Sequence, residues 1–249
     1  MTEDIRKAVQ RRYARLAGES QSCCSAAEDC VSSACGEGYS SEDLKDLPRG
    51  FQGRSLGCGN PIAMARLQPG ETVLDLGSGA GLDVLLASRE VGGEGKVYGL
   101  DMTDEMLELA ESNRREAGAD NVELLKGDME SIPLPSESVD VIISNCVVNL
   151  SPDKKQVLQE SHRVLRPGGR LAIFDLMWDR EPPSHVREDA ALWSCCIGGA
   201  LTRDQARDLL AECGFSQIRL ETMGKWGDCS ADSEGNKVLS VLIRAVRPA

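Results

Sequence analysis

Residues 72–81 read TVLDLGSGAG, and this stretch decides the fold. Thr72–Leu76 is a short apolar strand, and a turn with alternating glycines follows it. Glycine lets the backbone turn sharply and lets a ligand approach it closely. A dinucleotide-binding loop reads G-x-G-x-x-G, but here Leu82 follows a G-x-G-x-G run that lies behind Asp75. Such a loop suits a ligand with an amino-acid tail and a ribose but no phosphate.

Strand and helix patterns alternate downstream of this loop. Further strands are expected at 96–100, 121–125, 138–144 and 170–175, and helices at 82–90, 104–117 and 153–165. This alternation predicts the α/β class, with a parallel Rossmann-like sheet and helices on both faces. The sequence Pro167-Gly168-Gly169 is expected to end the last of these helices before its strand begins. A helix at 202–213, capped by Thr202, and strands at 216–221 and 238–246 complete the prediction.

The N-terminal part of the chain has a different character. Ile5, Val9, Tyr13 and Leu16 recur at spacings of three and four, which predicts a helix over residues 2–18. Residues 19–41 are rich in Ser, Ala, Glu and Cys and show no period, so an irregular arm is expected, with a short helix from Ser41. The chain is therefore divided into an N-terminal helix and Cys-rich extension (1–50) and one catalytic domain (51–249), with an insertion near 178–201.

Composition excludes several classes of protein. The net charge of -12 argues against a nucleic-acid partner and against an anionic membrane surface. No apolar run approaches the roughly 20 residues of a membrane span, and the first residues lack the apolar stretch of a signal peptide. A cytoplasmic location is expected. There the ten cysteines indicate metal, metalloid or redox chemistry, although some are expected to be small buried hydrophobes.

Acidic residues follow two further strands of the predicted sheet. Asp101 ends the second strand, where a carboxylate can accept both ribose hydroxyls, and Gly127-Asp128-Met129 ends the third. Asp128 could contact an adenine ring and Met129 could form an apolar wall beside it. Ligands bind at the carboxyl ends of strands in open α/β sheets, so these residues and the glycine loop predict one nucleoside pocket.

Five segments resemble the class I S-adenosylmethionine-dependent methyltransferases: VLDLGSGAG (73–81), VYGLDMTDEML (97–107), KGDMESIPLP (126–135), VDVIISNCVVNL (139–150) and RVLRPGGRLAIFD (163–175). The resemblance covers about residues 60–176 and implies S-adenosylmethionine as the methyl donor. It implies that the methionine end is held by Asp75, Gly77 and Gly79, with Ser78 in the same loop. By the same resemblance, Asp101 and Met102 hold the ribose and adenine, and Asp128 the adenine amine beside Met129. Asn145 then lies beside the reacting centre.

Cysteines from distant parts of the chain are expected near that centre. Cys58 precedes the first strand, Cys146 ends the fourth, and Cys195 and Cys196 lie in the insertion. Three thiolates suit a soft ion, but zinc prefers a fourth ligand and usually occurs with C-x2-C pairs, which are absent here. Trivalent arsenic takes three ligands in a pyramid and keeps a lone pair that can attack a methyl group without a general base.

The motifs SLGCGNP (55–61), ISNCVVNLSPDK (143–154) and CIGGAL (196–201) sharpen the resemblance to the arsenite methyltransferases. It implies that Cys58, Cys146 and Cys196 bind As(III) as substrate, supplied as arsenite or its thiol conjugates. It also implies that Cys35 assists by forming a disulfide, which a thiol reductant, thioredoxin or glutathione, then reduces. The N-terminal cap and the insertion are expected to cover the pocket.

Some assignments stay open at this point. The choice of Cys196 over Cys195 depends on alignment to GGAL, and Cys23, Cys24 and Cys30 are expected in an exposed tail. Cys213 is expected in the core and Cys229 in a polar loop, and His162 is interpreted as an ordinary helix-surface residue. Two other functions remain: a methyltransferase for a small organic substrate such as a quinone, and a non-catalytic metalloid-binding thiol protein.

Overall fold

The structure, a computed structural model, describes residues 2–18, 38–45, 47–48, 51, 55–230 and 235–249. In chain order its elements are α1 (Thr2–Gly18), α2 (Ser41–Leu44), α3 (Pro61–Ala65), β1 (Thr72–Leu76), α4 (Leu82–Val91), β2 (Lys96–Asp101), α5 (Asp104–Ala117), β3 (Val122–Lys126), β4 (Val139–Asn145), a 3-10 helix η1 (Val148–Leu150), α6 (Lys154–Val164), β5 (Leu165–Trp178), α7 (Ser184–Glu188), α8 (Ala190–Ser194), β6 (Leu201–Thr202), α9 (Arg203–Glu212), β7 (Ser216–Ser230) and β8 (Lys237–Val246). Among the described residues, no helix combines the length and apolar composition that a membrane span needs.

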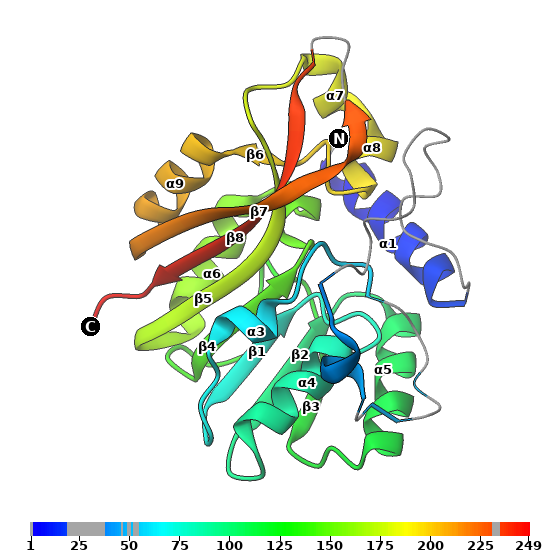
Figure 1. The fold of residues 1–249 in the computed structure, drawn as a ribbon, viewed down its shortest axis with the longest axis vertical. Helices are drawn as coiled ribbons and strands as arrows, with labels where there is room; N and C mark the ends of the chain where they lie inside the picture. Colours follow the sequence, from blue (N-terminus) through cyan, green and yellow to red (C-terminus); the bar gives the residue numbers. More distant parts are fainter. Residues whose placement is uncertain (1, 19–37, 46, 49–50, 52–54, 231–234) are drawn as a thin grey trace.

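The strands form one sheet in the order β3-β2-β1-β4-β5-β8-β7, with β6 beside β5 (Figure 1). The strands β1 to β5 run parallel, and β8 runs antiparallel to both β5 and β7. Leu76 pairs in register with Leu100 on β2 and with Ser144 on β4. The glycine loop, Asp101 and Asn145 therefore leave the sheet at the same edge. This edge is the switch point where strand order reverses and where open α/β sheets bind ligands.

Helices cover both faces of the sheet, which confirms the predicted Rossmann-like class. On one face, Ile62 of α3 and Leu86 of α4 belong to a core cluster with β1, β2 and β4. On the other face, Leu158 of α6 and Leu210 of α9 pack into a second cluster. A third cluster joins α1 to the insertion and contains the thiols Cys58, Cys146, Cys195 and Cys196.

Two strands are longer than the sequence predicts. β5 begins at Leu165, directly after α6, so Pro167-Gly168-Gly169 lies within the strand instead of separating it from the helix. Gly168 N–H donates to Arg247 O at 2.9 Å, so this segment is held by the chain beyond β8. The other long strand, β7, continues past the expected 216–221 to Ser230 because β8 pairs with it further along. Both extensions depend on partners that are distant in sequence.

Candidate functional site

A cavity of about 440 Å³ opens at the sheet edge where β1, β2 and β4 end. Eight of the residues predicted to bind the methyl donor line it: Gly77, Ser78, Gly79, Asp101, Met102, Asp128, Met129 and Asn145. Asp75 does not line it; this residue is 2% exposed, inside the sheet edge. The structure therefore gathers the predicted donor residues around one space, with Asp75 beneath it.

Helix α1 covers the cavity from outside. Arg6, Val9 and Tyr13 contribute to the lining, and Val9 is almost fully buried. The Arg6 guanidinium donates to Glu130 Oε1 at 3.0 Å, and Gln10 Nε2 donates to Met102 O at 3.3 Å. The N-terminal helix is thus part of the pocket wall.

The glycine loop is held by Asp101. The residues Gly77, Gly79 and Gly81 have φ values of 70°, 50° and 86°, which favour glycine. A Cβ on Gly77 would lie 2.4 Å from Val147 Cγ1, so a side chain does not fit there. Gly79 N–H donates to Asp101 Oδ2 at 2.9 Å, and Thr103 N–H donates to Oδ1 at 2.9 Å. Asp101 thereby links the end of β2 to the loop after β1.

The cavity edge is rich in buried carboxylates. Burial raises the pKa of Asp101, and burial with the charges of Asp83 and Asp101 raises the pKa of Asp75 well above its usual range. Burial also raises the pKa of Asp83 to about 6, although hydrogen bonds from Tyr39 and Asn145 oppose it. None of these three carboxylates forms an ion pair with a described residue, and buried carboxylates without such a partner favour a cationic ligand.

S-adenosylmethionine fits this chemistry. It carries a sulfonium and an ammonium group that the carboxylates can compensate, and a nucleoside that Met102 and Met129 can flank. Ser78 lines the cavity, but its Oγ is buried and has no hydrogen-bond partner among the described residues. Sequence reasoning missed Asp83, and the available signal was an acid in the first turn of the helix after the loop.

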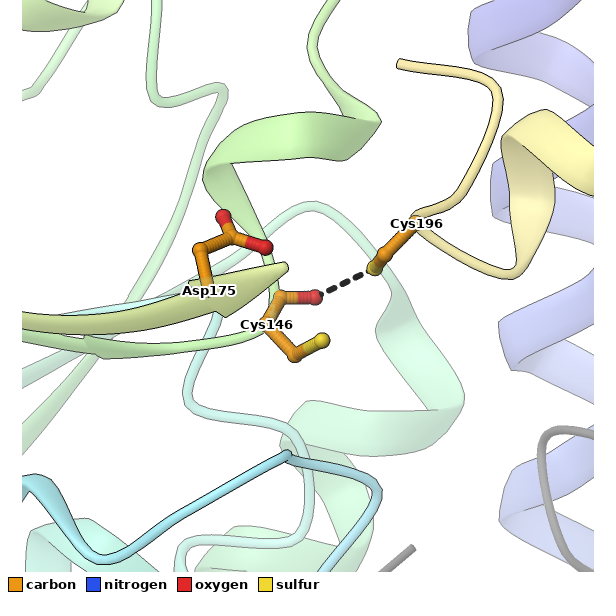
Figure 2. A group of neighbouring side chains, drawn as sticks. All are labelled: Cys146, Asp175 and Cys196. Atoms are coloured by element: carbon orange, nitrogen blue, oxygen red, sulfur yellow. Dashed lines mark hydrogen bonds between the residues drawn. The ribbon is translucent and has the colours of Figure 1, made fainter. Parts of the chain in front are cut away.

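The three predicted arsenic ligands are neighbours around Cys146. Cys58, Cys146 and Cys196 are each buried, and the thiols of Cys196 and Cys58 both interact with the Cys146 thiol. Cys196 Sγ also donates to Cys146 O at 2.7 Å, as Figure 2 shows. Because Cys146 lines the donor cavity, the thiol cluster adjoins it. Cys195 is buried too, but Cys196 is the neighbour that contacts Cys146.

The pKa values of the Cys146 and Cys196 thiols are raised. Hydrogen bonds with Cys196 and Cys58, followed by burial, raise the pKa of Cys146 well above its usual range. The hydrogen bond with Cys146 lowers the pKa of Cys196, but burial and the charge of Asp175 outweigh it and raise this pKa to about 11.

Asn145 holds the loop that carries Cys58. Its Oδ1 accepts from Cys58 N–H at 2.8 Å, and its Nδ2 donates to Gly59 O at 2.7 Å. A Cβ on Gly57 would lie 2.0 Å from Asn145 Cγ, and one on Gly59 would lie 2.2 Å from the Phe174 ring. The glycines on both sides of Cys58 therefore allow this close approach.

The loop that carries Cys196 is held by residues that sequence reasoning missed. Asn149 on η1 donates through its side chain to Asp175 Oδ1 at 2.8 Å and through its backbone to Oδ2 at 3.0 Å. Gly199 packs so closely that a Cβ would lie 2.0 Å from Asn149 O. Trp178 Nε1 donates to Ile197 O at 3.0 Å. The only sequence signal for Asp175 was an acid at the end of an apolar strand.

Other predicted cysteines have different outcomes. Cys213 is buried in the core, as expected. Cys229 lies on β7 and not in the expected polar loop, because β7 extends to Ser230, and its side chain is outside the part that the structure describes. Cys23, Cys24, Cys30 and Cys35 lie outside the described residues.

His162 differs from its interpretation as a helix-surface residue. Its ring packs edge-on against Phe215 with 5.3 Å between centroids, and burial, with the charge of Arg247, lowers its pKa. It is thus a partly buried packing residue, because β7 begins directly below it.

Comparisons with known proteins agree with this geometry. A family model described as a methyltransferase domain matches residues 67–214. The chain is 42% identical over 265 residues to an arsenite methyltransferase of Halobacterium salinarum, covering 99% of this chain and 68% of that protein. It is 39% identical to an arsenite methyltransferase of Mus musculus, covering 74% of this chain and 51% of that protein.

A solved structure of an arsenic(III) S-adenosylmethionine methyltransferase from Chlamydomonas reinhardtii is also similar. The TM-score is 0.73 at 35% identity, and the match covers 83% of this chain and 73% of that one. The chain spans about half of the mouse protein and about two thirds of the Halobacterium protein. It belongs to the arsenite methyltransferases, within the S-adenosylmethionine-dependent class I methyltransferase family.

Proposed function

We propose that this chain transfers the methyl group of S-adenosylmethionine to trivalent arsenic bound by Cys58, Cys146 and Cys196. One observation carries the proposal: Cys146 lines the donor cavity, Cys196 Sγ donates to Cys146 O, and the Cys58 thiol interacts with the Cys146 thiol. A single arsenic atom on these sulfurs would face the pocket that suits the donor. Holding both reactants in one site can supply about 7–11 kcal/mol of the barrier.

Arsenite can enter as a neutral hydroxide. Because the Cys146 and Cys196 thiols are protonated, each As–S bond can form as a thiol proton leaves with an arsenite hydroxide as water. Three such condensations release three waters and leave arsenic with its lone pair. The buried site needs no external base for this step.

The donor side is held by the glycine loop and Asp101. Asp101 accepts from Gly79 N–H and Thr103 N–H and remains available to ribose hydroxyls at the cavity wall. When bound, S-adenosylmethionine would supply a methyl group on a positively charged sulfur. The arsenic lone pair would form the As–C bond, and the donor sulfur would leave as a neutral thioether. Burial of the pocket by α1 excludes water from the reacting atoms.

The two other functions make different predictions. Demethylmenaquinone methyltransferases of Listeria are 38% identical over 114 residues, or 46% of this chain, but a quinone enzyme would not use three converging thiols. A pure metalloid-binding protein would not bind S-adenosylmethionine. About one equivalent of arsenite, lost on replacing Cys58 or Cys196, together with donor binding supports the proposed activity over both.

The remaining partners belong to the same proposal. Methylation formally oxidises arsenic, and Cys35 would return it to the trivalent state by forming a disulfide with another cysteine, which thioredoxin or glutathione would then reduce. The substrate would arrive as arsenite or a thiol conjugate, in the cytoplasm, and neither nucleic acid nor a membrane would take part.

Cys146→Ser tests the function directly. We expect this variant to lose methylation of arsenite, measured by arsenic speciation with S-adenosylmethionine and a thiol reductant, while donor binding persists. Cys213→Ser, at a buried thiol in another core cluster, is the matched control and should keep activity. Methylation retained by Cys146→Ser would contradict the assignment.

A further inference from the structure

A carboxylate lies beside the thiol cluster. Asp175 lies near the carboxyl end of β5, is 2% exposed, and its oxygen lies within 4.8 Å of the Sγ atoms of both Cys146 and Cys196 (Figure 2). Cys58 is not part of this group of three, but it interacts with the Cys146 thiol, so a movement of its Sγ toward the group would give three sulfurs and one oxygen.

Trivalent arsenic does not need the oxygen. It is complete with three sulfurs and a lone pair, so the proposed reaction leaves Asp175 without a role as a ligand. Zinc differs, because it prefers four ligands in a tetrahedron and accepts both thiolate and carboxylate. With Zn–S near 2.3 Å and Zn–O near 2.0–2.2 Å, ligand atoms in a tetrahedron lie about 3.5–3.8 Å apart. The ligand atoms of Cys146, Asp175 and Cys196 lie within 4.8 Å of one another, so these three must draw closer and Cys58 must move in to reach that spacing.

We propose that the same pocket binds Zn²⁺ through Cys58, Cys146, Cys196 and the carboxylate of Asp175, and that Zn²⁺ and arsenite compete for it. The sequence alone argued against zinc because no fourth ligand and no C-x2-C pair were visible. The fold supplies the fourth ligand from the neighbouring strand.

The surroundings of Asp175 are those of a supported metal ligand. Oδ1 accepts from Asn149 Nδ2 and from Leu176 N–H, each at 2.8 Å, and Oδ2 accepts from Asn149 N–H at 3.0 Å. Hydrogen bonds of this kind orient ligating carboxylates. The buried cation Lys154 acts on both Asp175 and Cys196 and offsets part of the negative charge of three thiolates and a carboxylate. Because Cys146 lines the cavity, the ion has a route of entry.

The two ligands differ in their proton balance. Arsenite condenses with three thiols and releases water, whereas Zn²⁺ must displace the thiol protons into solution. Binding of Zn²⁺ should therefore acidify a weakly buffered solution by about three protons per site, and binding of arsenite should not. This readout does not depend on methylation.

The test uses the full chain with five cysteines outside this site, Cys23, Cys24, Cys30, Cys35 and Cys229, changed to serine so that they cannot bind added metal. X-ray absorption of the Zn²⁺-loaded protein should show three sulfurs near 2.3 Å and one oxygen near 2.0–2.2 Å. Added arsenite should release the zinc in equal amount. Asp175→Asn should weaken Zn²⁺ binding about tenfold or more and weaken arsenite binding clearly less, because only Zn²⁺ loses a ligand. Cys213→Ser is the control and should change neither.

Three results would overturn the proposal: a zinc coordination shell without the oxygen, bound zinc that arsenite does not displace, or an equal loss of affinity for Zn²⁺ and for arsenite in Asp175→Asn. If that variant does not fold, the absorption spectrum of the chain with Asp175 intact still decides. The proposal uses the thiols assigned above to arsenic, but its readouts are metal binding and proton release. It can therefore fail while methylation stands, and methylation can fail while zinc binds.

Discussion

Replacing Asn145 with alanine should weaken the binding of arsenite more than the binding of S-adenosylmethionine. The side chain holds Cys58 N–H and Gly59 O at 2.8 and 2.7 Å, and its removal leaves both buried groups without this partner. An unsatisfied buried donor or acceptor costs about 1–3 kcal/mol, so the free energy of unfolding should fall by about 2–4 kcal/mol. Ser240 Oγ still donates to Cys58 O at 2.8 Å, so the loop keeps one anchor.

The effect on arsenite affinity depends on how much of the lost free energy had kept the Cys58 loop closed. If about 1–2 kcal/mol goes into loop opening, the fraction of protein with three thiols in place falls, and arsenite affinity drops about 5- to 30-fold. Titration calorimetry with arsenite measures this, on the chain with the N-terminal cysteines and Cys229 changed to serine. Affinity for S-adenosylmethionine should change less, because most of the cavity lining is intact.

Asn121→Ala is the matched control. Asn121 also bonds two backbone carbonyls, those of Ser88 and Gly92 at 3.1 and 2.9 Å, but it lies at the amino end of the strands. Its loss should lower stability in urea unfolding by a similar amount without affecting arsenite. Equal losses of arsenite affinity in the two variants, or no loss in Asn145→Ala, would refute the reasoning.

Three further predictions follow from other contacts. Asp101→Ala removes the acceptor of Gly79 N–H and Thr103 N–H, so affinity for S-adenosylmethionine should fall about tenfold or more while arsenite still binds; calorimetry measures both. Burial raises the pKa of Asp175 from 3.8 to about 7, so the folded state holds a proton that the unfolded state loses. The free energy of unfolding should therefore fall as pH rises from about 4 to about 7, by at most about 4 kcal/mol. Urea unfolding measures this fall, which should be smaller in Asp175→Asn. Gly199→Ala places a Cβ 2.0 Å from Asn149 O, so the Cys196 loop must shift; arsenite binding should be lost, stability should fall by about 1–3 kcal/mol, and donor binding should persist.

Local sequence was enough to predict the glycine loop, the acid at the end of the second strand and the helix cap, because each depends on residues close together in the chain. The glycine loop after β1 and the acid at the end of β2 are short-range signals, and parallel pairing then brings them to one edge. Thr202 was predicted as a cap, and its hydroxyl accepts from Gln205 N–H in a capping box. The length of β7 was missed because its outer half exists only where β8 pairs with it.

The supporting residues of the site were beyond sequence reasoning for a related reason. Asn149 and Asp175 are 26 residues apart, and each is unremarkable until β4 and β5 lie side by side. The cysteines were accessible to prediction because thiols are few and chemically distinct. An asparagine or an aspartate has many structural uses, so its role emerges only from its partners.

The backbone at Cys146 and Cys196 links these observations. Cys146 and Cys196 have φ values of 63° and 64°, a left-handed conformation that non-glycine residues rarely adopt and that costs about 1–2 kcal/mol each. The fold holds them there: Cys146 N–H donates to Phe174 O at 2.7 Å, and Cys196 N–H donates to Trp193 O at 2.9 Å. At the end of β4 this turn lets Asn145 bind the Cys58 loop while the next residue meets Cys196. Glycine would remove the strain but also the sulfur, so the strain persists because the thiol is needed at that point.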